Sequence, residues 1–347
     1  MLKLSLLFFL FQIAHADAFT EPGIPSTSQE CSRVDVSGKL GPGRDQLFTP
    51  WCYANAAADA ASYALGIRVS ASDIAVTFDE KVRVLSPNHF RLPVEETGGN
   101  AFYALKLANE KGFCPQAAVS DNPTVGIPFS DWDHNLHGSY CGDIKDLDCM
   151  VNQIRLLKLR FDEMGDYAIC ENKPGVIALR NIFPSLVNQN LRDVLRAITA
   201  THTIVDLTDL ACKGARRKIP NLSVEQVSFN ERSCVSNDGS TKARPGCVAA
   251  INEQLTIGNP VILGGSISYL FQKAFPFQLN SRAGHNYLLT GREFRHGVCG
   301  FIIRNSWGKE CPKDLAKSVE CSPESGNYWV DEATVLKETE DASWIKM

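Results

Sequence analysis

Cys52 is the residue whose surroundings in this sequence most favour covalent chemistry. It follows Pro50, which restricts the chain just upstream, and it opens an alanine-rich run without proline that ends at Gly66. This run predicts a helix that begins at Cys52 and ends at Gly66 as its left-handed cap. In the first turn of a helix, unpaired N–H groups and the positive end of the dipole favour a thiolate over a thiol. On this segment alone, a core cysteine between two aromatic neighbours is the simpler interpretation.

Two residues of the C-terminal third supply partners for a reactive thiol. His285 begins an apolar, strand-like run, and Asn305 ends a second one. If the two strands are adjacent, the side-chain oxygen of Asn305 accepts a hydrogen bond from one ring nitrogen of His285 and leaves the other nitrogen for Cys52. Trp307 is suited to shield that hydrogen bond from water, and burial strengthens it. These residues together favour a nucleophilic role for Cys52 over the core interpretation.

Further motifs occur around these residues, in this order: Gln46 six residues before the thiol, Cys52-Tyr53-Ala54, Gly98-Gly99, Gly284-His285, Asn305-Ser306-Trp307-Gly308 and Gly326-Asn327-Tyr328-Trp329. With them, the sequence resembles the papain-like cysteine peptidases over roughly residues 40–115 and 246–335. Ser70 and Asp73 resemble the start of that family's next helix, with the spacing of a capping box. The resemblance implies the fold class α+β, with a helical lobe, an antiparallel β lobe and the active site in the cleft between them.

The resemblance also implies a role for each site residue. Cys52 is the nucleophile, His285 the acid and base, and Asn305 the residue that orients the imidazole. Gln46 and the backbone N–H of Cys52 form the oxyanion hole. The substrate-binding residues are Gly98 and Gly99, whose backbone hydrogen-bonds a substrate strand, together with Gly284 and Trp307. No metal and no organic cofactor are implied.

The sequence departs from the family pattern in two respects. Thr49 and Glu96 stand where the family has a pair of cysteines, as if one disulfide were lost. His285 follows Cys52 by 233 residues, where the family has about 130–150. We therefore expect a helical lobe over 41–117, a cysteine-containing insertion over 118–245 and a β lobe over 246–347. Within the insertion, apolar residues at helical spacing predict helices over 147–164 and 185–199.

The N-terminus and the cysteine count indicate export. Residues 1–18 have a positive start, an apolar run and the small-residue pattern of a signal peptide. A short segment, 19–40, follows, too short for a helical prosegment. Twelve cysteines favour disulfides in an oxidising compartment, with connectivity left open, and a free Cys52 leaves an odd number to pair. The net charge of −4 argues against nucleic acid, and no later stretch is apolar enough for a membrane span.

These observations predict a secreted or periplasmic cysteine peptidase that hydrolyses polypeptides through a Cys52 thioester. A protein inhibitor is a further expected partner, while neither nucleic acid nor, after signal removal, a membrane is expected. Two alternatives stay open: a catalytically silent peptide-binding or scaffold protein on the same fold, and a thiol transamidase. The sequence leaves cleavage preference, endo- versus exopeptidase action and the restraint on activity undecided.

Overall fold

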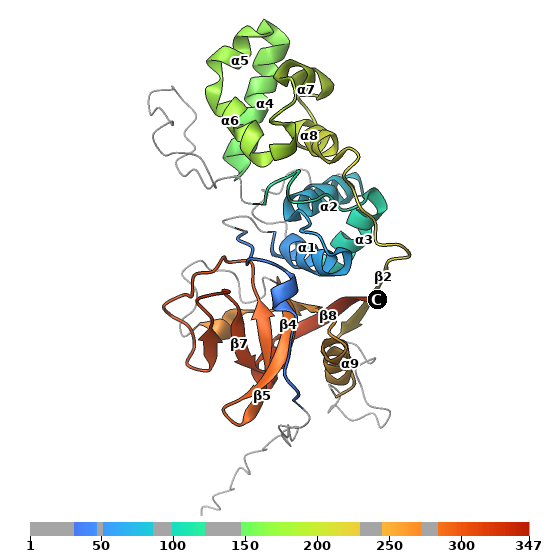
Figure 1. Cartoon of the computed structure of the whole chain (residues 1–347), viewed down its shortest axis with the longest axis vertical. Helices are drawn as coiled ribbons and strands as arrows, with labels where there is room; N and C mark the ends of the chain where they lie inside the picture. The colour runs from blue at the N-terminus through green and yellow to red at the C-terminus, as the bar shows by residue number, and fades with distance from the viewer. Residues whose placement is uncertain are drawn as a thin grey trace, which may run out of the picture.

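The computed structural model describes residues 31–46, 51–85, 99–121, 147–229, 245–271 and 284–346. Helices of the middle of the chain lie at one end of the molecule, the helices around Cys52 lie in the centre, and the sheet lies at the other end (Figure 1). The predicted α+β fold class, with a helical lobe and an antiparallel β lobe, is confirmed. The predicted signal peptide lies outside the described residues.

The helical lobe contains α1 (Cys52–Leu65), α2 (Ala71–Leu85) and α3 (Ala101–Lys111). As predicted, α1 begins at Cys52 and ends at Gly66, whose φ of 63° is left-handed. All of its alanines except Ala64 are buried, because α1 packs on α2 and α3 with one face and on the sheet with the other. Tyr53, Ile74 and Phe113 fill the core of this lobe. The small side chains of α1 thus allow both lobes to approach its backbone closely.

The start of α2 matches only half of the predicted capping box. Ser70 Oγ accepts a hydrogen bond from the N–H of Asp73 at 3.1 Å, as expected. The Asp73 carboxylate does not return this bond; it accepts from Arg216 at 3.0 Å and from the N–H of Cys114 at 3.2 Å. The first two N–H groups of α2 donate instead to Asp121, at 2.6 and 3.1 Å. The start of α2 is therefore capped by a residue far along the chain.

The β lobe is one antiparallel sheet. Its strand order is β2-β8-β3-β4-β5-β7-β6, and β1 pairs with β4 outside this path. The strands are β1 (Val34–Asp35), β2 (Ser223–Ser228), β3 (Val261–Gly265), β4 (His285–Arg295), β5 (Val298–Arg304), β6 (Val319–Cys321), β7 (Tyr328–Asp331) and β8 (Thr339–Lys346). Two helices, α9 (Pro245–Thr256) and α10 (Glu332–Lys337), accompany the sheet. Residues of α9, α10 and the sheet share a second core, which includes Ile251, Phe301 and Val335.

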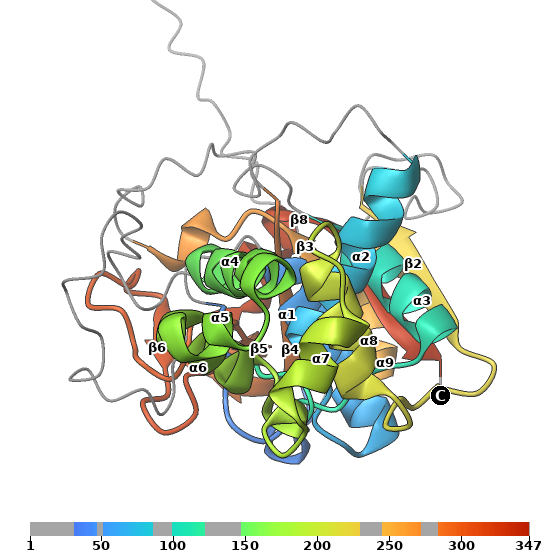
Figure 2. The same cartoon turned by 90° about the horizontal axis from the view of Figure 1, so that it is seen from above.

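The helical bundle of the predicted insertion has its own core. It contains α4 (Leu147–Met164), α5 (Tyr167–Glu171), α6 (Lys173–Ile182), α7 (Leu191–Ala197) and α8 (Thr203–Cys212). Figure 2 shows these helices over the lobe that contains α1. Ile154, Leu179 and Leu207 are among its fully buried residues, and Trp51, next to Cys52, packs against both this core and that of the helical lobe. The insertion therefore packs against Trp51, the residue that precedes the thiol.

The bundle differs from the sequence prediction in two places. The helix predicted over 147–164 is α4, but the one predicted over 185–199 is divided into a short 3-10 turn, Pro184–Leu186, and α7. The division has a local cause, because the Asn190 side chain accepts from the N–H of Arg192 and begins a new helix there. Strand β2 falls within 118–245 but pairs with β8 in the sheet. The separate core is therefore smaller than the predicted insertion.

Two of the three disulfides among the described residues join distant parts of the chain, and the third closes a short loop. Cys31 pairs with Cys299, Cys114 with Cys212, and Cys311 with Cys321. Among the cysteines of the described ranges, two are free, the buried Cys52 and the exposed Cys170. The expectation of disulfides with a second unpaired cysteine besides Cys52 is thus confirmed. None of the helices in the described ranges has the length and apolar character needed to cross a membrane.

Candidate active site

The lobes meet where the three predicted site residues lie. The N-terminus of α1 provides Cys52, the first residue of β4 is His285, and Asn305 directly follows the last residue of β5. Antiparallel pairing of β4 with β5 brings the start of one strand beside the end of the other. Each of the three residues is less than a tenth exposed. The structure therefore brings together residues that are more than 200 positions apart in sequence.

Hydrogen bonds fix the tautomer of His285. Its Nε2 lies 2.9 Å from Oδ1 of Asn305. The same Oδ1 accepts from the backbone N–H of Ser306 at 2.8 Å, and a backbone N–H can only donate. The atom facing His285 is consequently oxygen, so Nε2 must carry a proton and donate. This leaves Nδ1 for the hydrogen bond that joins the ring to Cys52.

The charges of Cys52 and His285 support one another. Burial alone raises the pKa of Cys52, but the positive charge and hydrogen bond of His285, with hydrogen bonds from Asn286, lower it below the usual value. Burial alone lowers the pKa of His285, whereas the Cys52 charge and the hydrogen bonds to Cys52 and Asn305 raise it. Both shifts favour a thiolate beside an imidazolium. Such a pair is the reactive form of a cysteine nucleophile.

Gln46 and Trp307 are both held close to this pair. The backbone N–H of Gln46 donates to the Ser306 carbonyl at 2.7 Å, and the Ser306 hydroxyl donates to Oε1 of Gln46. The oxygen end of the Gln46 amide therefore faces Ser306. The Trp307 ring lies with its centroid 5.3 Å from that of His285. Trp307 therefore packs against the imidazole, and its shielding of the hydrogen bond between Asn305 and His285 stays a prediction.

The predicted substrate-binding glycines are only partly described. Gly98 lies outside the described residues, and Gly284 is exposed next to His285. A Cβ at Gly99 would lie 2.7 Å from the Tyr53 ring, so only glycine fits there. Asn286 Nδ2 donates to the Gly99 carbonyl at 3.3 Å and thus joins the two lobes beside Cys52. Sequence analysis missed Asn286, although its position directly after His285 was a signal.

A buried group of ion pairs lies next to the residues of this site. Sequence analysis missed this group as well. Asp59 accepts from Arg44 Nε and from Arg304 Nε, each at 2.7 Å, and all three side chains are less than a tenth exposed. Arg44 also pairs with Asp121. Arg304 directly precedes Asn305, and Arg44 lies two residues before Gln46. The group thus connects α1 to both segments that carry the partners of Cys52.

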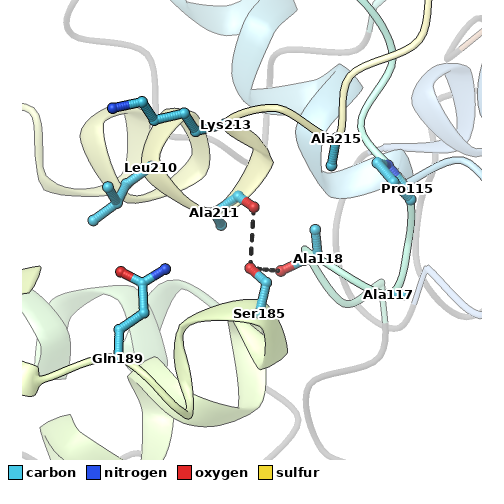
Figure 3. A pocket seen from close by; sticks show the side chains of 9 residues that line it. All are labelled: Pro115, Ala117, Ala118, Ser185, Gln189, Leu210, Ala211, Lys213 and Ala215. Atoms are coloured by element: carbon cyan, nitrogen blue, oxygen red, sulfur yellow. Dashed lines mark hydrogen bonds between the residues drawn. The ribbon is translucent and has the colours of Figure 1, made fainter.

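Two other features of the described residues do not belong to this site. Asp73, Cys114 and Cys212 lie close enough to ligate a metal ion, but the two sulfurs form a disulfide with each other. A cavity of about 600 Å³ lies between the turn after Pro115 and the bundle. There the Ser185 hydroxyl donates to the carbonyls of Ala118 and Ala211, at 3.2 and 3.1 Å (Figure 3). The cavity contains none of the predicted site residues.

Comparison with known proteins finds solved structures of low sequence identity. No model of a known protein family matches the chain, and no curated protein matches it. A solved structure from work on antibody cross-reactivity between the mite allergens Blo t 1 and Der p 1 is 14% identical, with a TM-score of 0.43, and the match covers 94% of this chain and 74% of that one. Digestive procathepsin L 3 of Tenebrio molitor larval midgut is 11% identical, with a TM-score of 0.40, over 93% and 72% of the two chains. Both TM-scores are below 0.5.

Proposed function

We propose that this protein is a papain-like cysteine peptidase in which Cys52 is the nucleophile. The observation that supports the proposal best is the hydrogen-bonded chain from a buried, free Cys52 through His285 to Asn305. A structural cysteine requires neither a protonated imidazole beside it nor an amide that fixes the tautomer of that imidazole. A nucleophile that must be a thiolate near neutral pH requires both.

The proposed reaction is hydrolysis of a peptide bond in two acyl-transfer steps. The thiolate attacks the peptide carbonyl, the C–N bond breaks, and the imidazolium gives its proton to the leaving amine. The product is a thioester on Cys52. Neutral His285 then removes a proton from water, which attacks the thioester, releases the carboxylic acid and regenerates the thiol. Asn305 keeps the ring oriented in both steps.

Negative charge develops on the carbonyl oxygen during each attack. Cys52 is the first residue of α1, so its backbone N–H is one of the unpaired donors of the helix start. We assign the second donor to the Gln46 amide, because Ser306 occupies its oxygen end. Donors of this kind typically contribute about 10²–10³-fold to the rate each. Asn305, His285 and Gln46 therefore have distinct proposed roles around one reacting carbon.

The chain contains a matched control for a test, because Cys170 is the other free cysteine in the part of the chain that the structure describes. We expect the wild type and Cys170→Ala to cleave a library of peptides, and Cys52→Ala to cleave none while keeping its circular dichroism spectrum. We also expect iodoacetamide to label Cys52 rapidly at pH values below about 8.5, the usual thiol pKa, since the pKa of Cys52 is lowered. Labelling would be followed by peptide mass mapping. Peptide cleavage by Cys52→Ala, or no cleavage by the wild type, would contradict the assignment.

The same proposal includes the compartment. Three disulfides join residues of the described part of the chain. Disulfides persist in oxidising surroundings and are rare in the cytosol. We therefore place the activity in a secreted or periplasmic setting, with polypeptides as substrates, and the expected protein inhibitor stays a prediction.

A further inference from the structure

The first turn of α1, which contains Cys52, begins without an ordinary capping residue. Trp51 occupies the N-cap position, and its side chain makes no capping hydrogen bond. An N-cap Ser, Thr, Asn or Asp would normally accept a hydrogen bond from an N–H of the first turn. The first turn also contains no acidic residue that would favour the positive end of the helix dipole. The start of α1 therefore lacks the N-cap side-chain bond that usually fixes a helix start.

Asn55, one turn further along α1, binds the first carbonyl of the helix twice. Its backbone N–H donates to the Trp51 carbonyl at 3.0 Å, as in any helix. Its side-chain Nδ2 donates to the same oxygen at 2.8 Å. The Trp51 carbonyl and the Cys52 N–H belong to one planar, trans peptide group, so the N–H points away from this oxygen. Two bonds on the oxygen therefore fix the direction of the Cys52 N–H.

Stability alone does not explain an asparagine at this position. The Asn55 side chain is 4% exposed, and its Oδ1 has no hydrogen-bond partner among the described residues. A buried acceptor without a partner is unfavourable, and asparagine is a poor residue for a helix interior. Both neighbours in sequence, Ala54 and Ala56, are alanines, the best helix formers. Departures from local preference of this kind are expected at functional sites.

We propose that Asn55 is a positioning residue for the oxyanion hole, because it aims the Cys52 N–H at the carbonyl oxygen of a bound substrate. The proposal rests on the peptidase function proposed above, in which this N–H stabilises the charge that develops in each attack. A donor does so best when it already points to the place that the charged oxygen will occupy. The Nδ2 bond also polarises the peptide group between Trp51 and Cys52, which makes its N–H a stronger donor. Asn55 thus acts through this peptide group.

The test compares Asn55→Ala with Asn55→Ser, which differ by one hydroxyl group. In a helix, a Ser hydroxyl can donate to the carbonyl four residues earlier, as Ser62 of α1 does to Ala58. We expect Asn55→Ala to lower kcat and kcat/KM equally on the best peptide of the library, by about 3- to 10-fold, the range of one neutral hydrogen bond. KM should stay unchanged, because the lost interaction is made in the transition state. Asn55→Ser should recover most of the loss.

Alkylation of Cys52 separates this role from a general effect on the thiol. Iodoacetamide reacts at a saturated carbon, where the C–S bond forms as the C–I bond breaks, and no charged carbonyl oxygen develops. The rate of alkylation and its pH profile should therefore be the same in the wild type and in both variants. Thr208→Val is the matched control, because it removes a side-chain bond of 2.7 Å to the carbonyl four residues earlier in α8. Its kcat/KM should equal that of the wild type.

Three outcomes would overturn the role of Asn55 in a wild type that cleaves peptides. They are full activity of Asn55→Ala, an equal loss in Asn55→Ser, and a fall in alkylation rate that matches the fall in kcat. If Asn55→Ala does not fold, Asn55→Val and Asn55→Thr form a second pair, of nearly equal shape, that differs in the hydroxyl. A wild type that cleaves no peptide is a different result, because the peptidase function then fails and the role of Asn55 fails with it.

Discussion

Asp59→Asn should strongly lower the stability of the protein, because Asp59 is the shared partner in a buried group of ion pairs. Asp59 lies between the guanidinium groups of Arg44 and Arg304, each 2.7 Å away, with Arg68 at 3.6 Å. Without its charge, Arg304 has no carboxylate partner among the described residues, and Arg44 keeps only Asp121. Removing one partner of a buried ion pair typically costs about 3–5 kcal/mol. We expect a loss of this size in the free energy of unfolding at pH 7, a large part of a usual total of about 5–15 kcal/mol.

The effect should depend on pH in a defined direction. Burial alone raises the pKa of Asp59, but Arg44, Arg304 and Arg68 together lower it below its usual value. A lowered pKa gives stabilisation that is complete above the unfolded-state pKa of about 3.9 and is lost as the pH falls through the folded-state value. The difference between wild type and Asp59→Asn should therefore be constant near neutrality and shrink below about pH 4.

The assay is urea unfolding followed by tryptophan fluorescence, with disulfides intact, at several pH values. A change in the midpoint at constant slope reports stability. The matched control is Asp193→Asn, because Asp193 lies 3.9 Å from Arg196 and both side chains are mostly exposed. Such a pair is worth about 0–1 kcal/mol. The reasoning is refuted if Asp59→Asn costs less than about 1 kcal/mol at pH 7, or no more than Asp193→Asn.

Two further predictions concern packing and covalent cross-links. Gly99→Ala should cost about 1–3 kcal/mol by urea unfolding, the usual range for overpacking, because its Cβ would lie 2.7 Å from the Tyr53 ring. Gly246→Ala in α9, with nothing within 4 Å of the added Cβ, should cost nothing, and equal costs at both glycines would count against this account. Replacing Cys114 and Cys212 together by alanine removes a covalent link between residues that are 98 positions apart in sequence. The free energy of unfolding should fall by about 2–5 kcal/mol. An unchanged melting temperature for the double variant would show that the bundle is held without its disulfide.

Sequence analysis predicted correctly those elements whose structure depends on residues close together in sequence. The start and end of α1 follow from its alanines and Gly66, and the strands that carry His285 and Asn305 follow from their apolar runs. The prediction of one helix over 185–199 was wrong because Asn190 begins a new helix, a capping effect that outweighs the apolar period.

Contacts between residues far apart in sequence could not be predicted in this way. Asp121 caps α2 from about 50 residues away, and Arg304 meets Asp59 across 245 residues. Charged residues at ordinary frequency give no sign of which of them will be buried together. The sequence also gave no reason to separate β2 from the insertion, since its pairing with β8 joins segments more than 110 residues apart.

The position of Asp59 on α1 connects stability to the proposed chemistry. Asp59 follows Cys52 by seven residues, about two helical turns, so both lie on the same face of α1. Arg304, the last residue of β5, donates a hydrogen bond to Asp59. The next residue, Asn305, is hydrogen-bonded to His285. The ion pair therefore fixes the position of α1 relative to the end of β5 two turns from the thiol. A shift there would misalign Cys52 and His285, the two residues that exchange the proton in the proposed reaction. Under the proposed function, Asp59→Asn should lower kcat more than it raises KM. The kinetics are measured without urea, where the variant is fully folded.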